Sequence, residues 1–392
     1  MKASEKRVLE ALASVDLIKI LQELISVPSA VGHEERLADH IGELLQKDGF
    51  DVHFRAVEGE RKNVIGTYPF DAPGRCLMFN GHLDTVAGSD GWDGDPHRAV
   101  RRDGRLYGLG ALDMKGGIAA SIAAMQALIA SGESWGGSVL FSGVIDEEGY
   151  SEGARALLGD GLNDVDAIII GEPLAGTEES PVPVLTTGKI LYRVTVRGVQ
   201  AHGFMPEQGV NAVEAAAKVI GVLERLSQVN HPRLGTGPVS TLKVHGGYDE
   251  YAVVVPDRCD IIISRMIVPG ETRERCVEDL EELIEGLDLA AEVDVDLVPP
   301  YYAPFETDAT SDLFRRFDAA YRDVHGRSPV YGPSSIITDA SIFCGIGGIP
   351  TLVYGPSGGA IHQANEYIDL ESLAACARTY ALTAARFLDL ST

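Results

Sequence analysis

The strongest constraint on the fold lies at residues 138–149, where an apolar run ends in consecutive acids. Ser138–Ile145 is mostly apolar and predicts a buried strand, and Asp146, Glu147 and Glu148 follow it directly. Adjacent carboxylates repel one another unless cations lie between them, and neighbouring residues at a strand end point to alternate sides. The pattern therefore indicates either a metal site or a solvated acidic turn after a core strand. In a metal site, Glu147 and Glu148 could have different roles, one binding a metal and the other moving a proton.

Two other predicted strand ends carry residues of the same chemical types. The apolar strand near 75–82 ends in His82, and Asp84 follows two positions later. Since residues i and i+2 of a strand share a face, Asp84 can orient a metal-binding His82, or the two can form a hydrogen-bonded core pair. Glu172 follows the apolar strand 165–170. Ligands of open α/β sheets gather at the carboxyl ends of the strands, so we expect these side chains to meet there.

Two glycine-rich loops add further candidates. Asp113 ends the loop 104–113, just before a predicted helix of small and apolar residues, where helix capping is the alternative role. His362 ends the loop 355–362. Zinc binds histidine nitrogens and carboxylate oxygens, and two zinc ions can share one carboxylate. The predicted metal ligands are His82, Asp113, Glu148, Glu172 and His362. This set gives each of two ions one histidine and one carboxylate, adds one shared carboxylate, and leaves Glu147 as the base.

The pattern of predicted elements changes near residue 188. Residues 188–298 predict the order β-α-β-β-α-β, with helices at 210–227 and 272–287, which is the ferredoxin-like unit. The pair Pro299–Pro300 marks its exit, after which helices and a strand resume. We therefore predict a first domain formed by residues 1–187 and 299–392 and interrupted by a second domain.

Near the N-terminus, residues 6–27 have the pattern of an amphipathic helix.

Composition excludes several classes of function. The chain has 392 residues and a formal net charge of −25, which repels nucleic acids and anionic membrane surfaces. Its five cysteines are scattered, without a Cys-x-x-Cys pair, and predict reduced core residues in a cytoplasmic protein. No stretch approaches the roughly 18 apolar residues of a membrane helix, and the N-terminus does not resemble a signal peptide.

The ordered motifs carry a resemblance to a known family. The segments concerned are Gly81–Thr85, Gly110–Gly117, Asp146–Glu148, Gly171–Pro173, Ala201–His202 and His362–Glu366. They resemble the acetylornithine deacetylase, succinyl-diaminopimelate desuccinylase and carboxypeptidase G2 family of dinuclear zinc metallopeptidases. The resemblance runs from about residue 15 to the C-terminus. It implies a zinc-exopeptidase-like three-layer α/β/α catalytic domain, with residues 188–298 as an inserted ferredoxin-like α+β lid and dimerisation domain.

The resemblance also implies roles for individual residues. His82 and Glu172 would bind one zinc, Glu148 and His362 the other, and Asp113 would bridge them; cobalt or manganese could replace zinc. Asp84 would support the ligands, and Glu147 would be the general acid and base.

His202 would donate to the oxyanion of the reaction, in similar enzymes often across a dimer interface, although a turn histidine is the alternative. Arg265 corresponds to an arginine that binds the substrate carboxylate in similar enzymes, but Ser264 and Val253 depart from the usual motifs. The substrates of the best-known members therefore do not transfer directly.

Three functions compete at this point. The first is a cytoplasmic, homodimeric amidohydrolase that removes an acyl group from an N-acyl amino acid. The second is a dipeptidase or glutamate-type carboxypeptidase with the same metals, and the third is a catalytically silent binding protein on the same fold. The first two functions share a small-molecule or short-peptide substrate. Neither has a nucleic acid or membrane partner.

Overall fold

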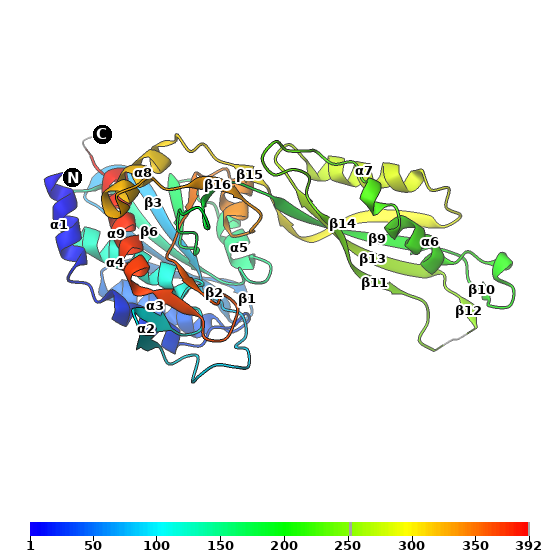
Figure 1. Cartoon of the computed structure of the whole chain (residues 1–392), viewed down its shortest axis with the longest axis horizontal. Coiled ribbons are helices and arrows are strands. Elements are labelled where there is room, and N and C mark those ends of the chain that lie inside the picture. The colour runs from blue at the N-terminus through cyan, green and yellow to red at the C-terminus, as the bar shows by residue number, and fades with distance from the viewer. Residues whose placement is uncertain (251–252, 391–392) are drawn as a thin grey trace. The chain divides into compact units, whose positions relative to one another are not determined.

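The structure is a computed structural model that describes residues 1–250 and 253–390. The chain divides into two compact units, coloured mainly blue, cyan, orange and red for the first and green and yellow for the second (Figure 1). Unit 1 comprises Met1–Val184, Thr307–Ser334 and Thr338–Thr392, and unit 2 comprises Leu185–Glu306 and Ser335–Ile337.

Unit 1 is built on a six-stranded mixed sheet in the order β1-β2-β6-β3-β7-β17. Its strands are β1 (Asp51–Glu58), β2 (Arg61–Pro69), β3 (Ala72–His82), β6 (Gly136–Val144), β7 (Ala167–Ile170) and β17 (Thr351–Val353). The neighbours β6, β3, β7 and β17 pair in parallel, whereas β1 and β2 are antiparallel to the strands beside them. The carboxyl ends of four strands therefore lie at one edge of the sheet.

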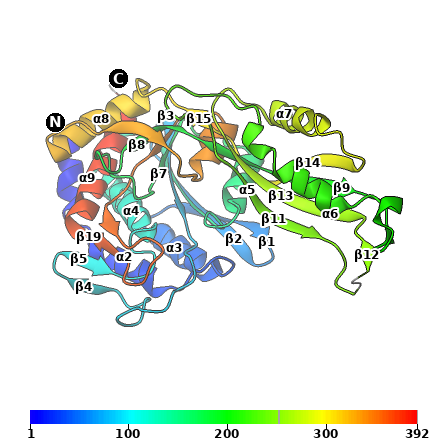
Figure 2. The ribbon, with the colours of Figure 1, turned by 45° about the vertical axis from the view of Figure 1, so that its right-hand side comes forward.

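Helices cover both faces of this sheet. They are α1 (Ala3–Leu12), α2 (Leu17–Ser26), α3 (Glu35–Lys47), α4 (Lys115–Ala130), α5 (Glu152–Asp160), α8 (Asp312–His325) and α9 (Leu370–Phe387). α4 and α9 lie on one face and α5 on the other (Figure 2). The glycines of α4 allow it to approach the sheet closely, because a Cβ at Gly117 would lie 2.0 Å from the carbonyl oxygen of Gly171. The predicted small-residue helix under the sheet is confirmed.

The N-terminal region differs from its prediction. The single helix expected over 6–27 is two helices, α1 and α2, separated at residues 13–16. The Asp16 side chain accepts a hydrogen bond from the backbone N–H of Lys19, at 3.0 Å. This bond caps a new helix start, and a short polar side chain at that position favours a break over a continuous helix.

Several short strands were not predicted. A second sheet of unit 1, in the order β18-β19-β5-β4, contains β4 (Val100–Arg102), β5 (Arg105–Tyr107), β18 (Gly358–Gly359) and β19 (Tyr367–Asp369). Strands of only two or three residues show too little hydrophobic periodicity to be recognised from the sequence. The pairing of Tyr107 with Tyr367 places the loop before Asp113 beside the loop that contains His362. A third sheet consists of β8 (Val182–Thr186), β15 (Phe305–Glu306) and β16 (Tyr331–Ser334), and the π-helix η3 (Ser341–Ile346) precedes β17.

Unit 2 has the predicted β-α-β-β-α-β order. Its antiparallel sheet runs β11-β13-β9-β14, with strands β9 (Gly188–Arg197), β11 (Val239–Gly246), β13 (Arg258–Ile267) and β14 (Glu292–Tyr302). Helices α6 (Ala212–Ile220) and α7 (Arg273–Glu285) pack on the sheet and share an apolar core with it. The strand order is that of the ferredoxin-like fold, as predicted. The short elements β10 (Ala201–His202), β12 (Val254–Val255), η1 (Pro206–Gln208) and η2 (Leu223–Arg225) complete the unit.

Two details of unit 2 correct the sequence analysis. The helix expected over 210–227 ends at Ile220, and a separate 3₁₀ turn follows it. Gly221 and the β-branched Val222 favour this early end, because both have poor helix propensity. Strand β14 also continues through Pro299–Pro300 to Tyr302, beyond the expected exit. Proline is tolerated there because β14 is an edge strand of the sheet.

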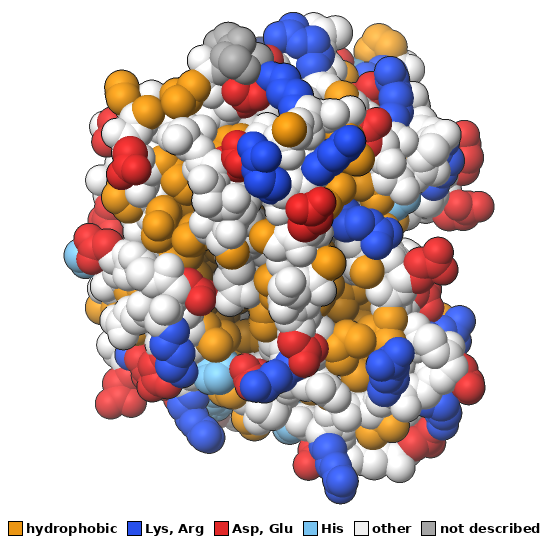
Figure 3. Space-filling view, turned by 90° about the vertical axis from the view of Figure 1, so that its left-hand side faces the viewer, with side chains coloured by type: hydrophobic (Ala, Val, Ile, Leu, Met, Phe, Trp, Pro, Cys, Tyr) orange, Lys and Arg blue, Asp and Glu red, His pale blue; other side chains and the backbone are white. Residues whose placement is uncertain are grey.

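The surface carries charged side chains of both signs (Figure 3). On the face shown in Figure 3, acidic and basic side chains are interspersed, without a continuous basic patch. None of the helices in the described part of the chain is long and apolar enough to cross a membrane. The five cysteines are free, and all but Cys344 are buried.

Candidate metal centre

The parallel strands bring the predicted ligands to one edge of the unit 1 sheet. His82 is the last residue of β3, and its partner in β6 is Val144, so Glu148 lies four residues past the end of the neighbouring strand. Glu172 follows the end of β7, which pairs with β3 on its other side. Asp113 stands two residues before α4 begins. The strand register therefore accounts for the convergence of these side chains.

The first group of ligands contains His82, Asp113 and Glu172. His82 Nε2 lies 3.1 Å from Asp113 Oδ1 and 3.7 Å from Glu172 Oε1. On the other side of the ring, Nδ1 donates to the backbone oxygen of Asp84 at 2.9 Å. Because Nδ1 is engaged in this way, Nε2 is the nitrogen left to bind a metal, and it faces the two carboxylates.

The second group contains Asp113, Glu148 and His362. His362 Nε2 lies 2.6 Å from Glu148 Oε1 and 3.3 Å from Asp113 Oδ2. The two oxygens of Asp113 thus face different histidines, Oδ1 towards His82 and Oδ2 towards His362. One carboxylate shared in this way is the arrangement expected of a bridging ligand between two ions.

The electrostatics of the cluster fit two divalent cations. Within each group, the candidate ligand atoms all lie within 4.8 Å of one another. Among the described residues, Glu172 Oε1 has no hydrogen-bond partner, and burial together with the negative charge of Asp113 raises the pKa of Glu172 well above its ordinary value. The hydrogen bond to Asp113 raises the pKa of His362 to about 9, so these acids favour a positive charge between them. Imidazole and carboxylate donors suit zinc and also cobalt or manganese.

Asp84 shapes the acidic turn after β6. Its fully buried carboxylate accepts hydrogen bonds from the backbone N–H groups of Glu147, at 3.1 Å, and Glu148, at 2.9 Å. Asp84 therefore holds both the His82 ring, through its backbone oxygen, and the turn that carries Glu148.

Glu147 makes no ion pair among the described residues, and burial and the charge of Glu172 raise its pKa well above the ordinary value. A raised pKa lets a carboxylate both accept and release a proton near neutral pH.

An arginine that the sequence analysis missed supports the same turn. Arg61 donates to Glu34 Oε1 at 2.7 Å and to Asp146 Oδ1 at 2.8 Å, and the Glu34 side chain is fully buried. Asp146 has a left-handed backbone (φ 69°), which turns the chain sharply before Glu147. Arg61 and Glu34 lie far from any recognisable motif, so only the fold reveals their role.

Asp339 is a buried acid two residues before the π-helix η3. Its carboxylate is buried, and the Ser151 side chain helps to stabilise its charge. Burial raises its pKa to about 7, and its charge in turn raises the pKa of Glu147 and of Glu172. Asp339 therefore belongs to the surroundings of the metal centre.

Arg265 does not have the surroundings of a substrate clamp. Its side chain is fully buried in the core of unit 2, where it contacts Glu271 Oε1, Asp279 Oδ2 at 3.3 Å and the backbone oxygen of Ser227 at 3.2 Å. A substrate carboxylate would have to displace these two acids. This geometry corrects the expected role of Arg265, which pairs with buried carboxylates of its own unit.

The buried pairing makes Arg265 important for stability. Removing one partner leaves buried charges without compensation, so we expect Arg265→Ala to lower the free energy of unfolding by about 3–5 kcal/mol. Chemical denaturation followed by circular dichroism measures this loss. Arg225→Ala is the matched control, because Arg225 is exposed in the same unit and should change stability by less than about 0.5 kcal/mol. A loss below about 1 kcal/mol for Arg265→Ala would contradict this account.

His202 lies in unit 2, in the short strand β10, and its side chain is exposed. Its Nδ1 accepts a hydrogen bond from the backbone N–H of Phe204 at 3.2 Å, and the two rings lie 5.2 Å apart. This contact leaves Nε2 available as a donor. The role of His202 at the metal centre stays a prediction.

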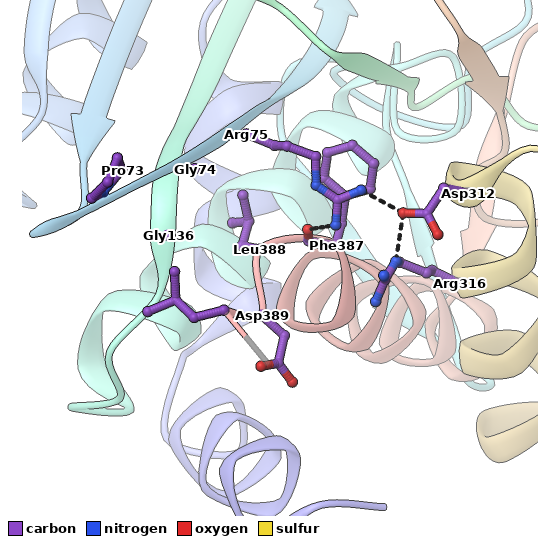
Figure 4. Close-up of a pocket in the computed structure, with 10 residues that line it drawn as sticks. Pro73, Gly74, Arg75, Gly136, Asp312, Arg316, Phe387, Leu388 and Asp389 are labelled. Carbon is purple, nitrogen blue, oxygen red and sulfur yellow. Dashed lines mark hydrogen bonds and ion pairs between the residues drawn. The ribbon is translucent and has the colours of Figure 1, made fainter. Parts of the chain in front are cut away.

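A cavity elsewhere in unit 1 has different chemistry. It has a volume of about 550 Å³ and lies at the start of β3, at the strand end opposite His82 (Figure 4). Its arginines, Arg75 and Arg316, both pair with Asp312, the latter at 2.8 Å. Because these charges are satisfied within the fold, the cavity does not compete with the metal centre as the functional site.

Comparisons with known proteins agree with this geometry. The model of the family described as peptidase family M20/M25/M40 matches residues 78–386. The chain is 27% identical over 394 aligned residues to the succinyl-diaminopimelate desuccinylase of Nitrosospira multiformis, covering 94% of this chain and 97% of the relative. It is also 27% identical over 379 residues to that of Wolinella succinogenes, covering 92% and 97%.

Solved structures show the same fold. The aminopeptidase PepT from Bacillus cereus superposes with a TM-score of 0.78 at 23% identity, covering 95% of this chain and 98% of that one. A dinuclear metal-binding peptidase of the M20 family from Bacillus subtilis superposes with a TM-score of 0.72 at 19% identity, with the same coverage. These neighbours confirm the predicted zinc-exopeptidase-like α/β fold. The family match over most of the chain, together with its metal-ligand clusters, shows that this protein belongs to peptidase family M20/M25/M40 and is a metal-dependent hydrolase of amide bonds.

Proposed function

We propose that the protein is a dinuclear metal amidohydrolase that removes the acyl group from an N-acyl amino acid. The observation that supports this proposal most strongly is the position of Asp113, whose two oxygens face His82 and His362 separately. His82 and Glu172 would hold one cation, Glu148 and His362 the other, and Asp113 both. When bound, two such cations polarise the scissile carbonyl and lower the pKa of a water molecule between them.

Glu147 would carry the proton in this reaction. It takes a proton from the attacking water and passes it to the nitrogen of the leaving amine, which needs a carboxylate whose pKa is close to neutral. Burial raises the pKa of Glu147 well above its ordinary value. Asp84 keeps Glu147 and Glu148 in place through their backbone N–H groups. These backbone contacts and the burial of Glu147 support the proposed roles.

The relatives and the solved structures favour two different substrate classes. The desuccinylase relatives favour an N-acyl amino acid, whereas the peptidase structures favour a dipeptide or a carboxy-terminal residue. A catalytically silent protein would have no need of a complete ligand set and base. We also propose a cytoplasmic location, because the scattered cysteines are typical of one. The family resemblance supports a homodimer that uses the inserted unit.

Hydrolysis assays separate these functions. N-acetyl, N-succinyl and N-formyl amino acids and a set of dipeptides should be tested with zinc, cobalt or manganese and after chelation. We expect turnover of at least one N-acyl amino acid, lost on chelation and restored by metal. Faster turnover of dipeptides than of every acyl amino acid would support the peptidase, and no turnover of either class with two bound metal ions would contradict the enzyme.

His202 is proposed to stabilise the oxyanion formed from the scissile carbonyl. Removing one such donor costs about 10²–10³ in kcat, so we expect His202→Ala to lower kcat by that factor with a smaller change in KM. His245→Ala, which removes another exposed histidine of unit 2, should leave both constants unchanged. Equal kinetics for the two variants would give His202 a merely structural role.

A further inference from the structure

Glu366 binds the backbone of the loop that carries the shared ligand. Its side chain is buried, with an exposed fraction of 2%. Glu366 Oε2 accepts a hydrogen bond from the N–H of Gly110 at 2.8 Å, and Oε1 accepts from the N–H groups of Leu112 at 2.7 Å and Asp113 at 3.0 Å. One carboxylate thus holds three amides of a four-residue loop, including the amide of Asp113 itself.

The backbone around Glu366 is anchored to the same loop. Its carbonyl oxygen accepts from the N–H of Gly108 at 3.1 Å, next to the pairing of β19 with β5. Four residues earlier, His362 contacts Asp113 and Glu148. The segment 362–366 therefore supplies one ligand of the second cation and fixes the backbone that presents another.

Burial raises the pKa of Glu366 to about 7, and the hydrogen bonds from the three amides act against this rise by favouring the carboxylate. In the part of the chain that the structure describes, no basic side chain lies within 4.0 Å of its carboxylate, so the three amides are its hydrogen-bonded compensation. A carboxylate is an acceptor at both oxygens, whereas the amide of a glutamine has one acceptor and one donor. Glutamine at this position would place a donor against the N–H of Gly110 or against those of Leu112 and Asp113.

We propose that Glu366 is a positioning residue for Asp113, and that it sets the affinity for the cation held by Asp113, Glu148 and His362. The inference rests on the two-cation centre of the proposed function. The other cation depends less on Glu366, since His82 and Glu172 are held by the ends of β3 and β7. Loss of a group that orients a metal ligand typically weakens metal binding by 10–100-fold.

The test is a zinc titration of metal-free Glu366→Gln protein, by calorimetry and by competition with a chromogenic chelator. We expect the site of Asp113, Glu148 and His362 to weaken by about 10–100-fold and the other site to change less, because it keeps His82 and Glu172. In protein loaded with two cobalt ions, the magnetic coupling between them should be reduced. Glu371→Gln, which changes an exposed acid five residues later, is the matched control and should bind both ions normally.

Further measurements separate positioning from plain stability. Glu366→Asp keeps a carboxylate and should recover part of the second-site affinity that Glu366→Gln loses. If both variants fail to fold, hydrogen exchange of the wild-type metal-free protein decides, because the amides of Leu112 and Asp113 should be protected. Unprotected amides, or a folded Glu366→Gln protein with two normal zinc affinities, would overturn the inference alone. Failure of the wild-type protein to bind two ions would overturn the proposed function as well.

Discussion

Glu147→Gln is expected to lower kcat by about 10²–10⁴, the usual contribution of a positioned general base. Glutamine has nearly the same shape, so the backbone contacts of residue 147 with Asp84 should survive. It cannot accept a proton from water, however, and therefore cannot return one to the leaving amine. Metal content should stay at two ions per chain, because neither ligand group contains Glu147. Steady-state kinetics combined with metal analysis of the same sample measures both quantities.

The control for this variant is Glu152→Gln. Glu152 is an exposed acid in the first turn of α5, five residues from Glu147, and belongs to neither ligand group. Its kinetics should match those of the wild-type protein. A Glu147→Gln protein that retains wild-type kcat would remove Glu147 from the chemistry, whereas one that loses metal would make it a ligand.

Asp113→Asn is expected to break the sharing of one carboxylate between two cations. Asparagine offers one oxygen, and its amide nitrogen would face either His82 or His362 in place of the other. We therefore expect one tightly bound ion per chain instead of two. Turnover should fall at least about 100-fold, because the loss of a group that only orients a ligand already lowers activity by about 10–100-fold. Metal analysis after dialysis, followed by kinetics with added metal, measures the effect.

Asp103→Asn provides the matched control for this change. Asp103 is exposed and has a left-handed backbone (φ 51°), a conformation that asparagine adopts readily. This variant should keep two ions and normal turnover. Two tightly bound ions in Asp113→Asn would show that Asp113 does not bridge the metals.

The parts of the structure that the sequence predicts are those governed by short-range patterns. The apolar runs before His82, Asp146 and Glu172 identify three strands, and the parallel arrangement of such strands places their ends together. For the same reason, the β-α-β-β-α-β order of unit 2 follows from alternating periodicities. Charged residues at the end of a buried strand indicate a candidate site, because burying a charge without a partner costs free energy.

The parts that could not be predicted depend on contacts between distant residues. Arg61 meets Asp146 across 85 positions, and Glu366 meets Leu112 across 254 positions, with no local signal at either end. Arg265 was assigned by resemblance to a motif, but whether an arginine binds a substrate or buried acids depends on the packing around it. Its partner Asp279 lies on a helix whose orientation the sequence does not specify.

Distant residues of unit 1 are proposed to hold two cations around Asp113. Anomalous diffraction from crystals grown with zinc, recorded on both sides of the zinc absorption edge, tests this proposal most directly. The account predicts two peaks, one bounded by His82, Asp113 and Glu172 and the other by Asp113, Glu148 and His362. A single peak, or peaks that contact none of these side chains, would contradict it.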